Sequence, residues 1–291
     1  MKTIVIIHNL NSRGKNINED YVRELLNKKG IKFHYFQTKQ ISDIDEIIKN
    51  YNNPSEFQYC SIGGDGSLNA LVNSLMKNNI TMPEVSCLPG GSGSDFIRTF
   101  ALPQNIEEAV EHLIFDNFYE VDVGFIKNKM DAKYFINVLN IGFLASTVEV
   151  SEKFPNLFRA FRYPLSFWIK IITARAKEMT ISNDKYEFKG MAFNICVCNA
   201  QYFGGGWNIS PKSSLQDGLF NVQVFAVTKL KATQIFFLAK KGLHLKESSV
   251  KLKRLSQLTV NSKDPIEIDG DFFGYGPAEI FIKKRAIRFK I

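Results

Sequence analysis

The stretch Ser61-Ile62-Gly63-Gly64-Asp65-Gly66-Ser67-Leu68-Asn69 decides the fold of the first third of the chain. It joins an apolar run at 57–62, which predicts a strand, to a segment with helical periodicity from Ser67 to about residue 76. Glycines let a backbone approach a phosphate closely, and a helix N-terminus offers free N–H groups and a positive dipole. The stretch therefore favours a phosphate-binding loop. A tight turn capped by Asp65 or Ser67 is the purely structural alternative.

The same alternation of elements continues on both sides of this loop. The sequence predicts strands at 3–8, 31–36 and 84–88, and helices at 20–29, 43–51, 94–100 and 105–115. Strands that alternate with helices at this spacing indicate a parallel sheet with crossover helices. Residues 1–125 are therefore predicted to form an α/β nucleotide-binding domain.

The pattern changes near residue 120. Mostly strand-like segments follow, at 118–126, 133–141, 180–188, 191–199, 219–227, 257–261, 265–269 and 277–283. Turn-like pairs such as Asn183-Asp184 and Asp269-Gly270 separate several of them, and one helical, aromatic stretch at 155–178 interrupts the series. Residues 126–284 are therefore predicted to form a mostly-β sandwich domain. The final residues, 285–291, are expected to form an edge strand of either domain, with packing back on the first as one option.

A second glycine cluster, Pro89-Gly90-Gly91-Ser92-Gly93-Ser94-Asp95-Phe96, follows the predicted strand 84–88. Loops after parallel strands lie at one edge of the sheet, where ligands bind. Asp65 in the first loop would repel a phosphate directly, so we interpret it as organising Mg²⁺, and Asp95 could hold metal or a substrate hydroxyl. Two such loops predict a Mg-nucleotide site, although the chain has neither a GxxxxGK[ST] nor a GxGxxG motif.

Composition narrows the class of protein. With 291 residues, two domains are expected. The excess of 37 Lys and Arg over 29 Asp and Glu gives a net charge of +8. Such a charge suits binding to nucleic acid, nucleotide phosphates or an anionic membrane, and it does not distinguish these partners. The four cysteines form no CxxC pair, and no apolar run approaches the ~18 residues of a spanning helix. We expect a cytoplasmic protein with reduced thiols.

The order of motifs resembles one family. Asn9-x-x-Ser12-x-Gly14, then Gly-Gly-Asp-Gly-Ser at 63–67, then Gly-Ser-Gly-Ser-Asp-Phe-x-Arg at 91–98 resemble the diacylglycerol kinase catalytic-domain family, specifically its bacterial soluble lipid kinases. Later matches follow in the same order: Asp122-Val123-Gly124, Asn137 to Phe143, Gly204 to Pro211, Gln216 to Phe220 and Asp269-Gly270-Asp271. The resemblance covers essentially the whole chain.

This resemblance implies a fold and an activity. The fold would be an α/β domain with a parallel sheet, like that of NAD kinases and diacylglycerol kinases, and a β-sandwich domain, with the active site in the cleft between them. The activity would be ATP- and Mg²⁺-dependent transfer of the γ-phosphate to a lipid hydroxyl, with diacylglycerol as the expected acceptor. The partners would be ATP and a lipid at the membrane surface, but not nucleic acid. A homodimer stays open.

The family pattern also implies roles for particular residues. Those expected at the nucleotide are Asn9, Asn11, Ser12, Gly14, Thr38, Gly63, Gly64, Asp65, Gly66, Ser67, Asn69 and Ser92. The network that positions catalytic Mg²⁺ and substrate would be Asp65, Asp95 and Asp122. Asp271 would be the general base. A structural Mg²⁺ would bind the carboxylate of Asp217 and backbone carbonyls near Ser214 and Leu219.

Some residues depart from the family pattern. Leu10 stands where Pro is usual, Ser92 replaces Thr and Ser94 replaces Asn. Asp271 replaces Glu, which draws the carboxylate back by one methylene, so a differently shaped acceptor or weak activity would follow. Asp-Gly-Asp is also a natural hairpin tip. Two alternatives therefore stay open: an enzyme like NAD kinase, and a nucleotide-binding regulator without turnover.

The aromatic stretch at 154–170 has two interpretations. Aromatic side chains interleave there with Arg159, Arg162 and Lys170, as in an amphipathic element at a membrane interface. An aromatic stripe at helical spacing is also typical of a core. Peripheral membrane association is therefore one hypothesis, and the acceptor could equally be a monoacyl glycerolipid or a sphingoid base.

Overall fold

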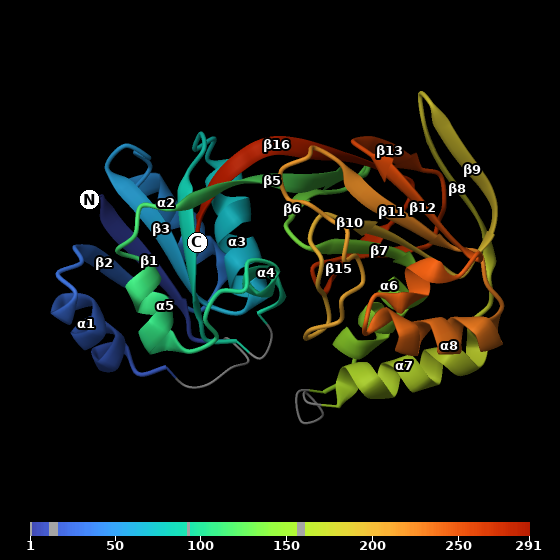
Figure 1. The fold of residues 1–291 in the computed structure, drawn as a ribbon, viewed down its shortest axis with the longest axis horizontal. Coiled ribbons are helices and arrows are strands. Elements are labelled where there is room, and N and C mark those ends of the chain that lie inside the picture. The colour runs from blue at the N-terminus through green and yellow to red at the C-terminus, as the bar shows by residue number, and fades with distance from the viewer. Residues whose placement is uncertain (1, 12–16, 92–93, 156–160) are drawn as a thin grey trace. The chain divides into compact units, whose positions relative to one another are not determined.

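The computed structural model describes residues 2–11, 17–91, 94–155 and 161–291. The chain is divided into two compact units, of which the first comprises Met1–Val123 and Lys283–Ile291 and the second Gly124–Ile282. Figure 1 shows both units, with the chain coloured from blue at the N-terminus to red at the C-terminus. The final residues thus belong to unit 1, with the N-terminal third.

Unit 1 contains a parallel sheet. Its strands, in spatial order, are β2 (Phe33–Thr38), β1 (Thr3–Asn9), β3 (Phe57–Gly63) and β4 (Glu84–Pro89). The end of β16 (Ala278–Lys290) pairs in parallel with β4 through Arg288 and Phe289. Strands β1 and β3 are apolar and almost completely buried, as expected for a parallel sheet covered on both faces.

Five helices accompany this sheet: α1 (Glu19–Lys28), α2 (Ile41–Asn50), α3 (Asp65–Lys77), α4 (Asp95–Thr99) and α5 (Ile106–His112). Val22 and Leu26 of α1 pack with Val110 of α5 and the strands beneath in one hydrophobic cluster. Helices α2 and α3 contact each other. The predicted α/β fold with its crossover helices is confirmed.

Unit 2 contains an antiparallel sheet of six strands. Their order is β12 (Val250–Leu255), β11 (Phe220–Phe225), β10 (Asn194–Cys198), β7 (Val138–Gly142), β14 (Pro265–Ile268) and β15 (Asp271–Tyr275). A second layer contains β13 (Gln257–Val260), β8 (Lys177–Asn183), β9 (Tyr186–Ala192) and β6 (Ala132–Phe135), with the unit 2 parts of β5 (Phe118–Lys127) and β16. Leu139, Val197 and Ile181 belong to the hydrophobic cluster that joins the two layers. The predicted sandwich is confirmed.

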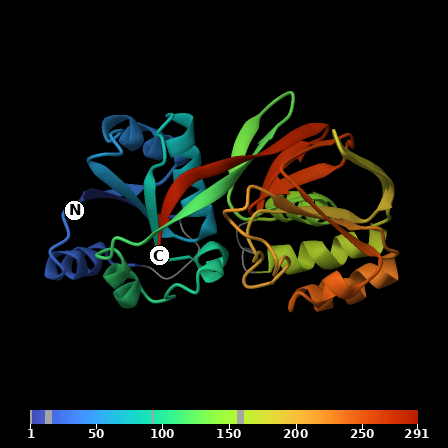
Figure 2. The ribbon, with the colours of Figure 1, turned by 45° about the horizontal axis from the view of Figure 1, so that its top comes forward.

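Helices cover the other face of the six-stranded sheet: α6 (Phe143–Glu152), α7 (Arg162–Thr173), α8 (Lys229–Ala239) and the 3-10 helix η2 (Leu243–Lys246). Phe167 of α7 and Ile235 of α8 share a cluster with Cys196 and Phe225 of the sheet. Figures 1 and 2 both show α7 and α8 side by side. Of the helices described, none is both long and apolar enough to cross a bilayer.

Several predicted boundaries were wrong. The strand expected at 133–141 is two strands, β6 and β7. The strand expected at 180–188 is interrupted by the turn after Asn183, whose side-chain oxygen accepts a hydrogen bond from the N–H of Lys185, so β8 and β9 form a hairpin. Residues 285–291 are not an edge strand, because β16 pairs with β4 through Arg288 and Phe289 and also pairs with β5. Helices α6 and α8 and strand β12 were missed, since α6 and α8 have apolar residues on several sides and show no clear periodicity.

Candidate functional site

The two glycine loops of unit 1 touch backbone to backbone. Gly63 ends β3, Gly64 is the N-cap of α3, and the second loop follows β4. The N–H of Gly90 donates to the carbonyl of Gly63 at 2.9 Å. A Cβ on Gly91 would lie 2.3 Å from the Cα of Gly64, a separation that atoms do not tolerate. The second loop therefore needs glycine in order to lie against the first.

Asp65 joins these loops through its side chain. Its carboxylate accepts hydrogen bonds from the N–H groups of Asp95 at 2.9 Å and Phe96 at 2.8 Å. These N–H groups begin α4, whose own N-cap residue, Ser94, makes no capping bond. Asp65 thus caps a helix in the other loop, and neither Asp65 nor Ser67 is the N-cap of α3, which is Gly64.

Polar residues from three neighbouring elements meet at the same edge of the sheet. The side chain of Asn9, at the end of β1, donates to the hydroxyl of Ser67 at 3.1 Å and accepts from the N–H of Asn11 at 2.9 Å. Thr38 ends β2 beside Asn9 in the parallel register. Asn69 lies in the second turn of α3 and is buried. The structure therefore brings together these residues, which the sequence predicts at a nucleotide.

Two further predicted carboxylates are buried in unit 1. Asp95 begins α4 and lies near Arg98, with 3.9 Å between its Oδ1 and the guanidinium Nε. Asp122 lies on β5, and its Oδ1 accepts from the N–H of Arg285 at 2.7 Å. No three acidic, histidine or cysteine side chains gather within metal-binding reach in the described chain, so Asp65, Asp95 and Asp122 do not form a ready-made cluster.

Part of the predicted nucleotide site lies outside the described residues, namely Ser12, Gly14 and Ser92. Gly66 is described, in the first turn of α3, and a Cβ placed there would meet no atom within 4 Å. Its role differs from that of Gly91, because Gly66 leaves open space above the helix N-terminus. That space is where a ligand of the helix would lie.

In unit 2 the predicted base directly follows a two-residue hairpin turn between β14 and β15. Asp269 and Gly270 both have positive φ, 50° and 92°, as a type I′ turn requires. The carboxylate of Asp269 accepts from the N–H groups of Ile136, Asn137 and Val138 at 2.7 to 3.0 Å. Asp271 follows the turn, with its side chain 65% exposed and its carboxylate 3.6 Å from Lys133 Nζ.

The predicted structural metal loop is folded around Asp217. One carboxylate oxygen of Asp217 accepts from the N–H of Leu219 at 2.9 Å. The other is bound by the guanidinium of Arg254 from β12. Ser214 lies in the same loop and is partly buried. A cation from the protein thus already neutralises the carboxylate that was expected to bind a metal.

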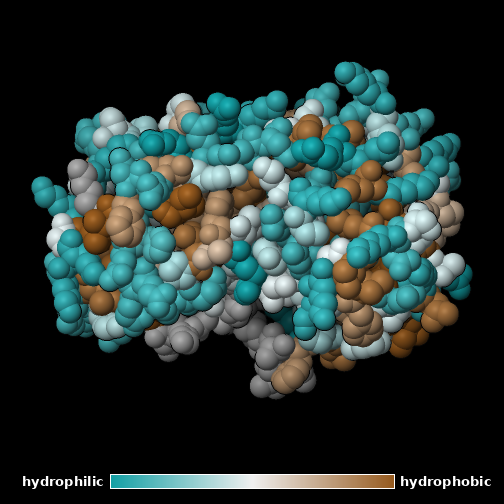
Figure 3. All heavy atoms as spheres, in the orientation of Figure 1, coloured by the Kyte–Doolittle hydropathy of each residue, from teal (hydrophilic) through white to brown (hydrophobic). Residues whose placement is uncertain are grey.

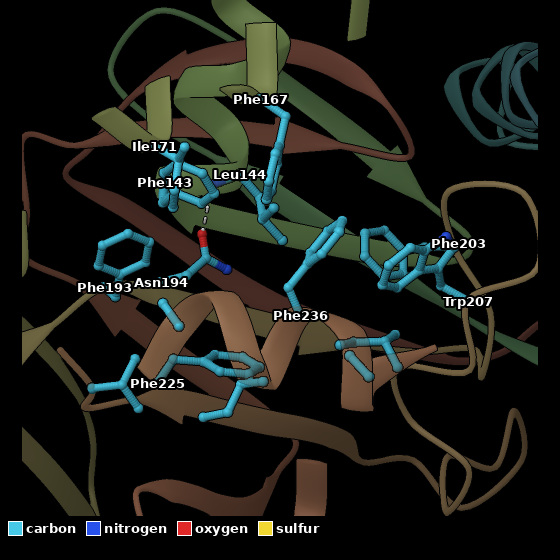
Figure 4. Close-up of a pocket in the computed structure, with 15 residues that line it drawn as sticks. Phe143, Leu144, Phe167, Ile171, Phe193, Asn194, Phe203, Trp207, Phe225 and Phe236 are labelled. Atoms are coloured by element: carbon cyan, nitrogen blue, oxygen red, sulfur yellow. Dashed lines mark hydrogen bonds between the residues drawn. The ribbon is translucent and has the colours of Figure 1, made fainter. Parts of the chain in front are cut away.

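An apolar pocket lies among α6, α7, α8 and the six-stranded sheet. Fifteen residues line it, of which Asn194 alone is polar, and its open volume is about 50 Å³. In Figure 4, the side-chain oxygen of Asn194 points toward the backbone of Leu144, and the aromatic rings of Phe143, Phe167 and Phe236 surround the space. The Asn194 oxygen accepts from the Leu144 N–H at 2.9 Å. The pocket is suited to hydrocarbon.

Two family models match this chain. The model described as the diacylglycerol kinase catalytic domain matches residues 3–126, and the model described as the YegS C-terminal NAD kinase beta sandwich-like domain matches residues 137–290. The chain belongs to the diacylglycerol kinase family. This confirms the resemblance found in the order of motifs and assigns the chain to a family of lipid kinases.

Curated relatives agree with this membership. A diacylglycerol kinase of Staphylococcus haemolyticus is 29% identical over 77% of this chain and 68% of its own length. A diacylglycerol kinase of Staphylococcus saprophyticus is 26% identical over 90% of this chain and 86% of its own length. Both matches span most of the two units.

Solved structures show the same fold. A diacylglycerol kinase structure from Bacillus anthracis is similar with a TM-score of 0.73 and 17% identity, over 99% of this chain and 96% of that one. A second structure from the same organism has a TM-score of 0.79 and 21% identity over the same shares of the two chains. The two-part architecture of the diacylglycerol kinase family is thus reproduced here.

One polar group of this family member was missed from the sequence. Glu267 stands in β14 between Ile266 and Ile268 and is buried. The carboxylate accepts hydrogen bonds from the side-chain amide of Asn140 and, at 2.9 Å, from the N–H of Gly270. Burial raises the pKa of Glu267 to about 8. The only signal in the sequence was a charged residue between two isoleucines, four positions before the predicted base.

Proposed function

We propose that this chain is an ATP- and Mg²⁺-dependent kinase that transfers the γ-phosphate to the hydroxyl of diacylglycerol. The observation that carries this proposal is the contact between the two glycine loops, which the side chain of Asp65 links to each other. The chain also belongs to the diacylglycerol kinase family. Phosphoryl transfer requires positioning and charge neutralisation more than covalent chemistry. Loops that touch through their backbones offer N–H groups in fixed places, which supports this activity.

The nucleotide phosphates would be bound at the carboxyl edge of the unit 1 sheet. Gly63 to Ser67 would contribute backbone N–H groups and the start of α3. The amide of Asn9 already donates to Ser67, and Asn11 donates from its side chain to the Lys39 carbonyl at 2.7 Å. These contacts hold the polar side chains in place before a ligand arrives, which lowers the cost of ordering them on binding.

The residues present fit a catalytic Mg²⁺. This ion binds through one or two carboxylates together with phosphate oxygens and water, so a cluster of three protein ligands is unnecessary. Asp65 and Asp95 lie in contacting loops, and a carboxylate that accepts two N–H bonds still has further lone pairs. When bound, the ion would neutralise the charge that develops on the phosphates. Asp65, Asp95 and Asp122 would hold it and orient the substrate.

The structural Mg²⁺ expected at Asp217 fits less well. A hard cation such as Mg²⁺ can bind a carboxylate together with two backbone carbonyls, here those near Ser214 and Leu219. The Arg254 guanidinium occupies one oxygen of that carboxylate, and a cation would have to displace it. We propose that Asp217 binds Mg²⁺ only when Arg254 moves away.

The lipid chain would occupy the apolar pocket of unit 2. Its volume of about 50 Å³ is small, since an apolar cavity of ~150 Å³ is what holds one benzene ring. The pocket would therefore have to widen, and its walls Phe167 and Phe236 lie on two different helices. Separation of α7 from α8 would supply that space.

The outer sides of these helices support peripheral membrane association. Exposed apolar side chains on α7 and α8 are Leu165, Trp168, Ile169, Ile172, Leu230 and Phe237. Figure 3 shows hydrophobic spheres over the region of α7 and α8. Phe167 instead faces the core, as the alternative interpretation of the aromatic stretch predicts, so the exposed side chains alone would contact a membrane. Of the stretch 154–170 proposed for an interface, residues 156–160, which include Arg159, lie outside the described residues.

Asp271 would act as the general base. It would take the proton from the acceptor hydroxyl as that oxygen attacks the γ-phosphorus. Its exposure allows access to a substrate, and its carboxylate lies 3.6 Å from Lys133 Nζ.

A screen of acceptors tests this function. Purified protein is incubated with γ-labelled ATP and mixed micelles containing diacylglycerol, a monoacyl glycerolipid or a sphingoid base, and in a separate reaction with NAD. We expect phosphatidic acid from diacylglycerol, complete loss with a chelator and no labelled NAD. Phosphorylation of NAD would instead support the NAD kinase alternative. Thermal stabilisation by ATP without labelling of any acceptor would support a regulator.

A further inference from the structure

Glu267 is a buried carboxyl group that contacts amides rather than a cation. Its side chain is 4% exposed, and its two oxygens accept from Asn140 Nδ2 and Gly270 N. Within the described residues, no Lys, Arg or His forms an ion pair with it. Removing an ionisable group from water without a counter-charge costs free energy. A simple apolar residue would fill a sandwich strand at lower cost, which points to a function for the carboxyl group.

Hydrogen bonds extend from Glu267 to the apolar pocket. Asn140 donates to Glu267, and the Asn140 oxygen accepts from Asn194 Nδ2 at 3.1 Å. Asn194 in turn is the polar residue of the pocket wall and accepts from the Leu144 N–H at 2.9 Å. All three side chains are buried. Side chains in such a network hold one another in single orientations.

In the other direction Glu267 holds the turn that carries Asp271. Asp269 fixes the first half of the turn through the backbone N–H groups of 136–138. The second half is fixed by the bond of 2.9 Å from Gly270 N to Glu267. Since Asp271 is one methylene shorter than the family's Glu, the placement of its backbone decides whether its carboxylate reaches a hydroxyl.

We propose that Glu267 is a positioning residue that fixes the 269–271 turn and links it, through Asn140 and Asn194, to the wall of the apolar pocket. This inference rests on the proposed function, because it assigns the pocket to the lipid and the turn to the base. An occupied pocket and a correctly placed Asp271 are then parts of one hydrogen-bonded arrangement within unit 2.

The ionisation of Glu267 should strengthen its hold on the 269–271 turn. Its pKa is raised to about 8, mainly by burial; the charges of Asp269 and Asp271 also raise it, and the hydrogen bonds from Asn140 and Gly270 lower it. When Glu267 loses its proton, both oxygens become full acceptors for the Asn140 amide and the Gly270 N–H, so the turn that places Asp271 is held more firmly. The rate should therefore rise as the pH increases through about 8.

Other titratable groups face this region from the elements around it. They are Tyr163 of α7, Cys196 of β10, Glu149 and Glu152 of α6, Asp269 and Asp271 of the turn, Tyr275 of β15 and Lys133 of β6. Burial raises the pKa values of Tyr163 and Cys196, so neither gains charge near pH 8.

The test uses Glu267→Gln, which keeps the shape of the side chain but cannot titrate. Its matched control is Glu84→Gln, a buried glutamate of unit 1 that binds Arg288 and Gln58. Turnover and KM for diacylglycerol and for ATP are measured from pH 6 to 9.5. Above pH 8, where the wild type is ionised, we expect Glu267→Gln to lower kcat about tenfold, the order expected when one of two buried donors loses its acceptor; below it the protonated glutamate and the glutamine should behave alike. KM for ATP should stay unchanged, and the rise in rate near pH 8 should disappear.

A second measurement does not need activity. Hydrogen exchange of peptides covering 266–275, measured above pH 8, should speed up in Glu267→Gln and not in Glu84→Gln, because one of the two oxygens that accept from Asn140 and Gly270 is replaced by a donor. If Glu267→Gln does not fold, Asn140→Leu replaces it, since it removes a donor and leaves the carboxyl group in place.

The possible outcomes separate the two proposals. No turnover of any lipid by the wild type refutes the proposed function, whereas exchange at 266–275 still tests the link between Glu267 and the turn. Wild-type exchange, kcat and pH profile in Glu267→Gln would overturn the inference while leaving the kinase intact. Combination with Asp271→Asn should give an effect smaller than the product of the two single effects, because both act through one turn. An effect of the double variant equal to the product of the two single effects would contradict the inference.

Discussion

The carboxylate of Asp65 accepts a hydrogen bond of 2.9 Å from the backbone N–H of Asp95, so the first glycine loop caps the helix that the second one begins. A carboxylate at the start of a helix is stabilised by the free N–H groups and the helix dipole. Asp65 therefore has a structural task in addition to the proposed one at Mg²⁺. The two tasks can be separated by substitution.

Asp65→Ala should abolish both tasks. Two N–H groups of α4 lose their acceptor, which should destabilise the protein by ~2 kcal/mol, and turnover should fall at least ~100-fold. Urea unfolding and the micelle assay measure these effects. Asp65→Asn retains one oxygen acceptor, so it should recover part of the stability. Recovery of turnover to the wild-type level in Asp65→Asn would show that Asp65 has no role at the metal.

Gly91→Ala should separate the glycine loops. The added Cβ would lie 2.3 Å from Gly64 Cα, so the second loop has to move and the N–H bond from Gly90 to Gly63 weakens. We expect ATP affinity to drop at least ~tenfold, measured by calorimetry. Gly66→Ala is the control for stability, because its Cβ meets nothing within 4 Å. Thermal unfolding of Gly66→Ala should match the wild type or exceed it slightly. Unchanged ATP binding by Gly91→Ala would contradict the proposed site.

Asp271 can be tested by changing its charge and its length separately. Asp271→Asn should lower kcat by ~100-fold or more, with KM for ATP unchanged, because general bases contribute on this scale. Asp271→Glu restores the missing methylene and should retain or raise the rate. If Asp271→Asn turns over diacylglycerol as fast as the wild type, the base is another group.

Glu267 should make stability fall as the pH rises. Its pKa is raised from 4.5 to about 8 in the folded protein, so the folded state binds an extra proton between these values. The corresponding stability is fully present below pH 4.5 and is lost as the pH approaches 8. At roughly 1.4 kcal/mol per pKa unit, the loss is several kcal/mol. Glu267→Gln should lack this slope when urea unfolding is compared at pH 5 and pH 8. An equal slope in both proteins would place the pKa of Glu267 near its ordinary value.

The outer faces of α7 and α8 should bind anionic membranes. Trp168→Ser with Ile172→Ser removes two side chains that are 55% and 72% exposed. Because both side chains are largely exposed, the free energy of unfolding should change by less than about 0.5 kcal/mol. Co-sedimentation with phosphatidylglycerol vesicles at low salt should fall several-fold. Met130→Ser is the control, because Met130 is 94% exposed and lies between β5 and β6, away from α7 and α8 in the chain. Equal binding by all three proteins would exclude this surface.

Local patterns in the sequence were sufficient for much of unit 1. Buried β-branched runs, glycine at loop positions and helical periodicity each come from neighbouring residues, so strands such as β3 and β4 were predicted within one residue of their ends. The order of motifs also identified the family. Helices α6 and α8 were missed because their apolar residues contact both the sheet and the pocket. A pattern with several apolar sides has no distinct period.

By itself, the sequence determined where glycine and aspartate occur, and therefore that two loops at one edge of a parallel sheet could bind a nucleotide. Only the tertiary structure decided what each aspartate contacts. Asp65 caps a helix thirty residues away, Asp217 binds Arg254, and Glu267 lies under a turn whose placement depends on strands far apart in the chain. These partners are set by packing and by the need to satisfy buried polar groups, and neither is written in the spacing of neighbouring residues.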